Sequence, residues 1–487
     1  MSMLGHERLT AALVGLICMF AVTVDAAMWV SGPNSVSQPG VYGTKGEPDA
    51  GNIPGARYGS ISWIDGSGNF WLFGGSGLDG SGDEGRLNDL WRFEPSSGLW
   101  TWVSGSDGAY QFGVYGTKGV PDANNAPGAR DLSISWIDGG GNFWLFGGYG
   151  LDASGSAGRL NDLWRFEPSS GFWTWVSGPN TINQFGVYVS KGVPDANNMP
   201  GARRIGISWI DVSGDLWLFG GDGFDGSGGS GPLNDLWKFD GVNWTWVSGS
   251  NVTSRPGVYG DKGEPNSMNV PGSRYGGVCW MDYSGNLCLF GGEGFDAGGS
   301  FGWLNDLWQF DGTNWTWVSG SDTVYQFGFY GTKGVPNRRN APGSRKNGIC
   351  WIDSVGDLWL FGGYGLGVSS QGRLSDLWRF EPSTSFWTWV SGSNLVNQPG
   401  VYGSKGVPNA DNVPGARDLC ISWIDSGGNL WLFGGNGLDG TGSFGSLNDL
   451  WQFECEKPAG DLNGDCKVDF TDFGIMASHW LEKGRRN

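Results

Sequence analysis

The sequence predicts an all-β protein built from many short strands, and three observations support that fold class. Its 487 residues contain 91 glycines and 30 tryptophans, so turn-forming residues and large aromatic residues are both abundant. Only 16% of the residues are charged, and no long segment has the periodicity of an amphipathic helix. Glycine-rich stretches alternate with aromatic ones, which is typical of strands joined by turns and not of a disordered chain.

A repeat of about 72 residues organises most of the chain. The segment Trp-Leu-Phe-Gly-Gly, or a close variant, recurs six times, and its first glycine is at Gly74, Gly147, Gly220, Gly291, Gly362 and Gly434. We call these segments units 1 to 6. In unit 1 we expect four strands, a to d, at residues 58–64, 69–73, 89–93 and 99–103. Of the 30 tryptophans, 28 occupy repeated positions, which favours packing between neighbouring units as their first role.

Three motifs in each unit carry a resemblance to a known family. They are the Gly-Gly pair after strand b, a Leu-Asn-Asp-Leu-Trp segment entering strand c, and an aromatic residue followed by Trp, as in Phe93 and Trp100. Across residues 28–454 the chain thereby resembles kelch-repeat β-propellers, the superfamily of the galactose oxidase propeller. The resemblance implies a six-bladed β-propeller with four-stranded blades around a channel. These units are longer than kelch units, which run to about 50 residues.

The two ends of the repeat predict how the propeller closes. Unit 6 has candidates for strands a, b and c, but no Trp-Thr-Trp-Val-Ser-Gly segment follows them. Residues 28–32 read Met-Trp-Val-Ser-Gly and match the missing segment. We therefore expect an N-terminal strand to complete the last blade and to leave no open sheet edge.

The N-terminus and the net charge predict where the protein works. Residues 1–26 resemble a signal peptide, with Arg8, an apolar run over residues 9–24 and a cleavage site ending at Ala26. The propeller would then span residues 27–455, and the mature chain would be secreted or extracytoplasmic, at the cell surface or in the periplasm. A net charge of −18 disfavours nucleic acid as a partner. No membrane span is expected in the mature chain, which we expect to be a monomer.

The connections between strands are unequal in length. The d–a connections run about 24 residues, as at 33–56, and the b–c connections about a dozen, as at 76–88. Both kinds emerge on one face, and long patterned loops are often functional. Each d–a loop carries one tyrosine, which makes the set Tyr42, Tyr115, Tyr188, Tyr259, Tyr330 and Tyr402 a candidate binding set.

An arginine immediately precedes strand a in every unit, giving the set Arg57, Arg130, Arg203, Arg274, Arg345 and Arg417. Such a ring would suit a carboxylate or sulfate ligand, and arginines of some kelch propellers bind acidic peptides, as the resemblance implies. The alternative, which we favour, is a structural tie in each blade to the aspartate that begins strand c, such as Asp89. The residues after these arginines differ between units and are better candidates for specificity: Tyr58, Asp131, Arg204, Tyr275, Lys346 and Asp418.

The composition argues against several catalytic mechanisms in the propeller. The two histidines are His6 and His479, both outside the repeats, so no His-dependent nucleophile or His-ligated copper is expected there. No unit carries an acidic cluster that the others lack. The favoured function is a non-catalytic binding or scaffold protein that recognises an extracellular protein or polysaccharide through the long loops. The alternatives are a carboxylate-based glycosidase and a purely structural surface protein.

Residues 456–487 differ from the repeats. Oxygen ligands recur at positions 1, 3, 5, 7, 9 and 12 of a loop formed by Asp461, Asn463, Asp465, Lys467, Asp469 and Asp472, with Lys467 offering its carbonyl. This spacing predicts a Ca²⁺ site of the EF-hand type followed by a helix, and it resembles one dockerin type I repeat. Dockerins carry two repeats, so a cohesin-like partner, another surface protein and the propeller itself are all open as partners. We also expect a disulfide between Cys455 and Cys466.

Overall fold

The computed structural model describes residues 26–282, 284–353, 356–454 and 475. Every regular element within residues 26–454 is a β-strand, and the paired strands are antiparallel. In this described part, no helix has the length and apolar character needed to cross a membrane. The expected signal peptide, the Ca²⁺ loop and the Cys455–Cys466 disulfide lie outside the described residues.

The first three units supply sixteen of the strands. Unit 1 forms β2 (Pro48–Asp49), β3 (Arg57–Tyr58), β4 (Ile61–Ile64), β5 (Phe70–Leu78), β6 (Glu84–Glu94) and β7 (Leu99–Ser104). Unit 2 forms β8 (Arg130–Asp131), β9 (Ile134–Ile137), β10 (Phe143–Leu151), β11 (Ala157–Glu167) and β12 (Phe172–Ser177). Unit 3 forms β13 (Arg203–Arg204), β14 (Ile207–Ile210), β15 (Leu216–Phe224), β16 (Ser230–Phe239) and β17 (Trp244–Ser248).

The last three units supply the remaining strands, together with one strand from the N-terminus. Unit 4 forms β18 (Arg274–Tyr275), β19 (Val278–Met281), β20 (Leu287–Phe295), β21 (Phe301–Phe310) and β22 (Trp315–Ser319). Unit 5 forms β23 (Arg345–Lys346), β24 (Ile349–Ile352), β25 (Leu358–Phe361), β26 (Tyr364–Leu366), β27 (Gln371–Arg373), β28 (Leu377–Glu381) and β29 (Phe386–Ser391). Unit 6 forms β30 (Arg417–Asp418), β31 (Ile421–Ile424), β32 (Leu430–Leu438) and β33 (Phe444–Phe453), and the N-terminal strand is β1 (Ala27–Ser31).

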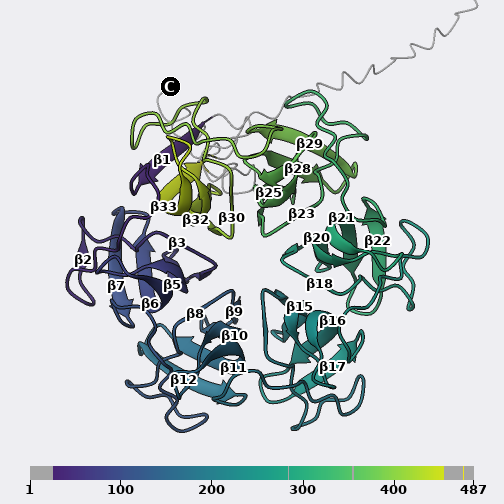
Figure 1. Ribbon diagram of the computed structural model, residues 1–487, viewed down its shortest axis with the longest axis horizontal. Coiled ribbons are helices and arrows are strands. Elements are labelled where there is room, and N and C mark those ends of the chain that lie inside the picture. The colour runs from purple at the N-terminus through teal and green to yellow at the C-terminus, as the bar shows by residue number, and fades with distance from the viewer. Residues whose placement is uncertain (1–25, 283, 354–355, 455–474, 476–487) are drawn as a thin grey trace, which may run out of the picture.

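The sheets lie around a common centre, with strand a of each unit innermost and strand d outside (Figure 1). Strand a is interrupted in every unit, as between β3 and β4, and both parts pair with strand b. In unit 5 strands b and c are interrupted as well, so that unit forms two sheets. Repeated antiparallel sheets arranged in this way form a β-propeller.

The b–c connections are shorter than the sequence suggested, which corrects the expected loop over residues 76–88. Strand β5 continues to Leu78 and β6 begins at Glu84, so only a tight turn remains. The turn is fixed by Asp79, whose Oδ1 accepts hydrogen bonds from the backbone N–H groups of Ser81 and Asp83. This Asx-type geometry lets the ladder extend further than hydrophobic alternation alone indicates.

The Gly-Gly pair follows from the close approach of neighbouring units. Gly74 has a φ of 62° in the left-handed region. A Cβ there would lie 2.8 Å from the Arg130 carbonyl oxygen of unit 2 and 2.9 Å from the Leu87 carbonyl oxygen. Gly434 of unit 6 stands in the same relation to the Arg57 carbonyl oxygen of unit 1, at 2.9 Å. Only glycine fits where two units meet this closely.

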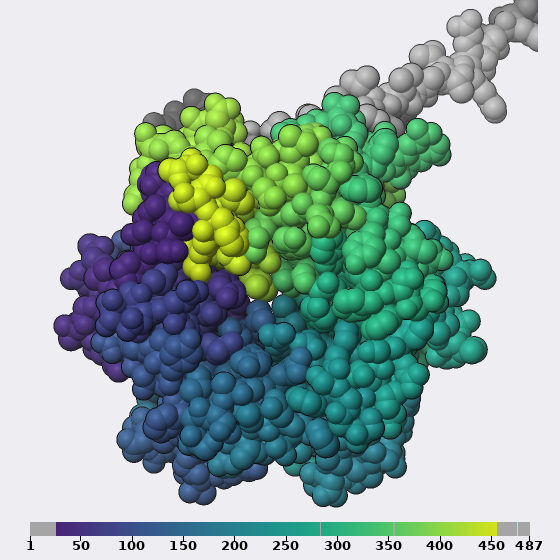
Figure 2. All heavy atoms as spheres, viewed as in Figure 1, coloured from purple at the N-terminus to yellow at the C-terminus, as the bar shows by residue number. Residues whose placement is uncertain are grey.

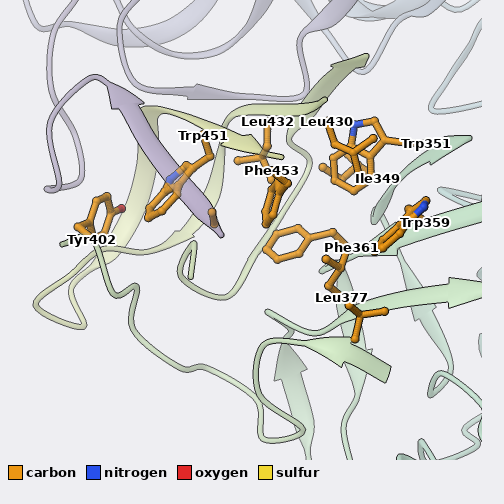
Figure 3. Close-up of a cluster of buried hydrophobic side chains, with 12 residues drawn as sticks. Ile349, Trp351, Trp359, Phe361, Leu377, Tyr402, Leu430, Leu432, Trp451 and Phe453 are labelled. Atoms are coloured by element: carbon orange, nitrogen blue, oxygen red, sulfur yellow. The ribbon is translucent and has the colours of Figure 1, made fainter. Parts of the chain in front are cut away.

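Six apolar clusters each join two neighbouring units. The cluster between units 5 and 6 contains Trp351, Phe361 and Leu377 on one side and Leu432 and Phe453 on the other (Figure 3). Another cluster joins unit 6 to unit 1. The tryptophan after each strand-c aspartate, such as Trp91, is fully buried in every unit. The repeated aromatic residues therefore pack between neighbouring units, as the tryptophan count predicted.

The N-terminal strand pairs with the last strand of unit 6. In the ladder between β1 and β33, Trp29 lies opposite Trp451 and Ala27 opposite Phe453. The coloured views show the same neighbourhood, with the N-terminal purple residues against the yellow C-terminal ones (Figure 2). The d–a loop before unit 6 contacts β1 in the way that the other d–a loops contact their strand d. Asn409 forms a bridge with Ala27, as Asp122 does with Trp173 in unit 2.

The d–a loops are ordered along the outside of the sheets. In unit 1 the loop forms β2, which pairs with β7, the outermost strand of that sheet. Isolated bridges hold the loop of each other unit to its outermost strand in the same way. These loops therefore cover edges that would otherwise expose unpaired backbone groups.

Candidate functional site

The six predicted arginines lie inside the units and not at an accessible surface. Each guanidinium donates to both carboxylate oxygens of the strand-c aspartate, at 2.6 to 2.8 Å. In unit 1, Arg57 also donates to the carbonyls of Gly55 and Gly74, and its exposed fraction is 1%. The other five, Arg130, Arg203, Arg274, Arg345 and Arg417, are equally buried. The favoured interpretation, a structural tie between the arginine and the strand-c aspartate, is therefore present in every unit. A cationic ring open to a ligand does not fit the burial of these arginines.

The six predicted tyrosines belong to the same network. Tyr42 donates its hydroxyl to Asp89 Oδ2 at 2.7 Å, and Trp91 Nε1 donates to the same oxygen. The corresponding hydroxyls of Tyr115, Tyr188, Tyr259, Tyr330 and Tyr402 donate to their own aspartates at 2.6 to 2.7 Å. Burial and the aspartate charge raise the pKa of Tyr42 far above its usual range. The d–a loops are thus anchored by their tyrosines, which are not offered to a ligand.

The loop lysines are also used structurally. Lys45 donates to the Gly105 carbonyl at 2.7 Å, and its ammonium lies 4.2 Å from the centre of the Trp102 ring. Five further lysines stand over the corresponding tryptophans, including Lys405 over Trp29 of β1. Cation–π contacts of this kind hold each loop against the outermost strand.

A series of backbone hydrogen bonds surrounds the centre, where strand a is interrupted. The donors have left-handed backbone conformations, with φ between 54° and 66°, and are Gly59, Leu132, Ile205, Gly276, Asn347 and Leu419. Each N–H donates to the carbonyl of its counterpart in the preceding unit, at 2.7 to 3.2 Å, and Gly59 donates to Leu419. A β-branched residue in this region, as at Ile205, is a true outlier and stores strain.

Next to this series lies a part of the repeat that differs between units. We call it the rim: three residues per unit that face one another across strands a, b and c. In units 1 to 3 they are Tyr58, Ser76 and Arg86, then Asp131, Tyr149 and Arg159, then Arg204, Asp222 and Pro232. In units 4 to 6 they are Tyr275, Glu293 and Trp303, then Lys346, Tyr364 and Arg373, then Asp418, Asn436 and Ser446.

At two junctions of the rim, an arginine of strand c meets the strand-a aspartate of the next unit. Arg86 Nε lies 3.2 Å from Asp131 Oδ2, and its guanidinium carbon is 4.3 Å from the centre of the Tyr149 ring. Arg373 Nε lies 2.8 Å from Asp418 Oδ1. Both carboxylates are nearly buried, and burial raises the pKa of Asp131 and of Asp418 while the arginines oppose the rise.

Between units 2 and 3, one carboxylate receives two arginines. Asp222 Oδ2 accepts from Arg159 Nη2 at 2.7 Å and from Arg204 Nε at 3.0 Å. Arg159 also donates to Ser230 Oγ at 3.0 Å. The Arg204 guanidinium carbon lies 5.6 Å from the Tyr149 ring centre, so this junction is continuous with the preceding one.

Between units 4 and 5, the charges are reversed and aromatic residues accompany them. Glu293 pairs with Lys346 and accepts a hydrogen bond from the Tyr275 hydroxyl. Burial and Glu293 raise the pKa of Tyr275 far above its usual range. Trp303 packs against Tyr364 with ring centres 5.3 Å apart. This junction therefore differs in both sign and shape from the others.

The cations of the rim are more exposed than its carboxylates. The side chains of Arg86, Arg159, Arg204, Lys346 and Arg373 are 18 to 35% exposed, whereas the four carboxylates are 7 to 14% exposed. The rim holds one more cation than carboxylates, on a chain whose net charge is −18. The surface that the rim offers is thus cationic and aromatic, with its carboxylates set behind.

Among the described residues, the cysteines and the potential metal ligands contribute little to a candidate functional site. Cys279, Cys288, Cys350 and Cys420 are free. Cys279 and Cys288 do not face each other across the β19–β20 pair, because Trp280 lies opposite Cys288. Within residues 26–454, apart from 283 and 354–355, no group of three or more His, Cys, Asp or Glu side chains is placed to hold a metal ion.

The sequence located only part of this site. The strand-a residues of the rim were singled out because they differ between units. Their partners on strands b and c, including Arg86, Tyr149, Arg159 and Trp303, were missed. The signal was present, since these positions also differ from unit to unit among otherwise repeated neighbours. Comparing every column of the six units, and not only the column after the arginine, would have found them.

The comparisons with known proteins concern the fold and not the sequence family. No protein-family model matches the chain, and no curated protein matches it. Among solved structures the chain is similar to that of YjhT, with 14% sequence identity and a TM-score of 0.48, covering 82% of this chain and 95% of the other. A likeness at this level says nothing about the ligand.

Proposed function

We propose that this chain is a secreted, non-catalytic recognition protein that binds an extracellular protein or polysaccharide through the rim and the loop residues beside it. The observation that carries the proposal is the rim itself. Its residues are chemically different in each unit, whereas the network immediately around them is repeated six times. A scaffold that repeats its buried network while it varies one partly exposed polar layer is suited to selective binding.

Exposed aromatic side chains beside the rim support this function. Tyr110, Phe112, Phe185, Tyr325 and Phe327 are each about half exposed, at 49 to 58%. The Tyr110 backbone N–H donates to the carbonyl of the rim residue Arg86, so this part of the d–a loop borders the rim. Aromatic and arginine side chains on one surface are typical of the centres of binding interfaces.

The architecture in this proposal is a kelch-type propeller of six blades, closed by β1. Three contacts support it: the β1–β33 ladder, the apolar cluster between units 6 and 1, and the Gly59–Leu419 hydrogen bond. Unit 5 counts as one blade because its two sheets meet at the Gly362–Gly363 pair. The propeller spans residues 27–455, and the tail at 456–487 adds a dockerin-like Ca²⁺ site with an open choice of partner.

Binding and its loss in rim variants test the proposal. We would screen the protein against an array of plant, animal and bacterial glycans and against extracellular proteins, and then compare Arg204→Gln and Lys346→Gln with the wild type. Each substitution removes a partly exposed rim cation, and a charge-assisted contact contributes about 1.5–3 kcal/mol, so affinity should fall at least ~10-fold. Lys238→Gln is the matched control, since Lys238 is similarly exposed and pairs with Asp215 outside the rim.

Three results would contradict the proposal. Full affinity in both rim variants would place the ligand elsewhere. Release of a shorter product from a bound glycan, measured by chromatography, would instead support the alternative of a carboxylate-based glycosidase. A protein that binds no ligand in either screen would favour the purely structural alternative.

A further inference from the structure

A second candidate site lies on the outer wall, away from the rim. A cavity of about 620 Å³ opens between the outermost strand of unit 3, β17, and the d–a loop and strand β22 of unit 4. Its lining includes Lys191, Trp246, Ser248, Arg255 and Trp315. The volume falls within the ~300–1,000 Å³ of small-molecule sites.

The chemistry of this cavity is unusual for such an acidic chain. Among the lining residues there are two cations and no carboxylate, although the sequence holds 48 acidic residues. Three buried donors there have no acceptor: Trp246 Nε1, Trp315 Nε1 and Ser248 Oγ. Two of these positions are unpaired elsewhere in the repeat as well, at Trp100 Nε1 and Ser31 Oγ, so Trp246 Nε1 is the donor that distinguishes this cavity.

Arg255 breaks the sixfold repeat at this cavity. The corresponding residue in the other units is glutamine: Gln38, Gln111, Gln184, Gln326 and Gln398. Each of those glutamines donates its amide Nε2 to a carbonyl two residues earlier in its own loop. Arg255 is exposed, and its guanidinium has no side-chain partner among the described residues. The substitution therefore replaces a loop-closing amide with a free cation.

Trp246 breaks the repeat in a second and independent way. The corresponding indole N–H groups of Trp29, Trp102, Trp175, Trp317 and Trp389 donate to the carbonyl of the serine two residues later. Trp246 Nε1 lacks that bond, and the serine two residues later, Ser248, also has an unpaired hydroxyl. Lys191 lies 4.4 Å from the Trp246 ring centre, which adds positive charge on the same side chain.

We propose that this outer cavity binds an oligosaccharide that bears carboxylate or sulfate groups. The anionic group would accept hydrogen bonds from Arg255 and from Trp246 Nε1. The side chains of Trp246 and Met268 offer apolar contact to the C–H faces of a sugar ring. The amides of Asn251 and Asn314 can form hydrogen bonds with its hydroxyl groups. The inference goes beyond the rim function and does not depend on it.

Calorimetry with defined ligands tests this site directly. We would titrate the full chain with an oligogalacturonate hexamer, a heparin-derived hexasaccharide, neutral xylohexaose and a hexaglutamate peptide. We expect one of the two anionic saccharides to bind, the neutral one to bind at least tenfold more weakly, and added salt to weaken binding. Arg255→Gln restores the residue used by the other five units, so it should fold normally and lower the affinity at least tenfold.

Two further variants make the result specific to the cavity. Trp246→Phe keeps an aromatic ring and removes the unpaired N–H, and it should also weaken binding. Arg339→Gln removes the same charge from an exposed position of the next d–a loop and should leave binding unchanged. Equal loss in Arg339→Gln, or binding untouched in Arg255→Gln, would overturn the site. Binding of hexaglutamate but of neither saccharide would overturn the ligand class. Loss in rim variants such as Lys346→Gln would show that the saccharide binds at the rim.

Discussion

Removing Asp89 should destabilise the protein more than removing Asp89 and Arg57 together. Asp89 accepts two hydrogen bonds from Arg57, one from Tyr42 and one from Trp91, all at 2.7 Å. The aspartate is fully buried and Arg57 is 1% exposed. In Asp89→Ala the guanidinium stays buried without a counter-charge, which costs about 3–5 kcal/mol. The unpaired Tyr42 and Trp91 donors add about 1–3 kcal/mol each.

The double variant separates the charge from the other contacts. In Arg57→Met with Asp89→Leu no charge is left behind, and apolar side chains of similar volume fill the space. Replacing a buried ion pair in this way is often neutral or stabilising. The two unpaired donors remain, so we expect the double variant to recover about 3–5 kcal/mol relative to Asp89→Ala. Adding Tyr42→Phe should recover part of what remains.

Equilibrium unfolding in urea, followed by tryptophan fluorescence, gives the comparison. Asp162→Ala is the matched variant in unit 2, where the same four bonds occur at 2.7 to 2.8 Å, and should cost a similar amount. A cost below about 1 kcal/mol for Asp89→Ala would refute a charge buried at this depth. Loss of ligand binding in the Arg57→Met, Asp89→Leu variant at full stability would instead return Arg57 to the binding site.

Two further predictions concern the ends of the chain. Deleting residues 27–31 should uncover the edge of β33 and remove Trp29 from its contact with Tyr402, whose ring centres are 5.1 Å apart, and should therefore lower the thermal midpoint. An unchanged midpoint would contradict closure by β1. Calorimetric titration with Ca²⁺ should give a heat signal that Asp461→Ala and Asp465→Ala each abolish, since both supply carboxylate ligands. Absence of heat in the wild type would rule out the calcium loop.

The sequence predicted the β-propeller fold because its signal is carried by repetition. Six copies of the same Gly-Gly and tryptophan positions average out local ambiguity, so strand type could be assigned with few errors. The ends of the strands were less predictable. Strand β5 runs five residues past the expected end because Asp79 caps a tight turn. Strand a is interrupted at Gly59 because the backbone there turns toward the neighbouring unit. Both effects depend on contacts outside the hydrophobic pattern.

The sequence raised two possible roles for the arginines but could not decide between them. Strand spacing put Asp89 within reach of Arg57, which left a tie and a ligand site both open. What decides between them is the carbonyl of Gly74, the hydroxyl of Tyr42 and the indole of Trp91, which complete a buried cage around the pair. These groups come from separate segments of the unit, and their convergence is a property of the folded sheet.

The two candidate sites differ in how much the sequence reveals about them. Arg255 stands alone in a column of glutamines, so its departure from the repeat is visible in the sequence. Trp246 is identical to its five counterparts, and only the structure shows that its indole N–H has lost the usual acceptor. A symmetric scaffold is informative for this reason. Five units show the hydrogen bond that the repeat normally makes. The unpaired donor in the remaining one, unit 3, therefore marks a place where the chain departs from its own pattern. When such a departure coincides with a free cation in one cavity, selective binding explains both better than a packing defect explains either.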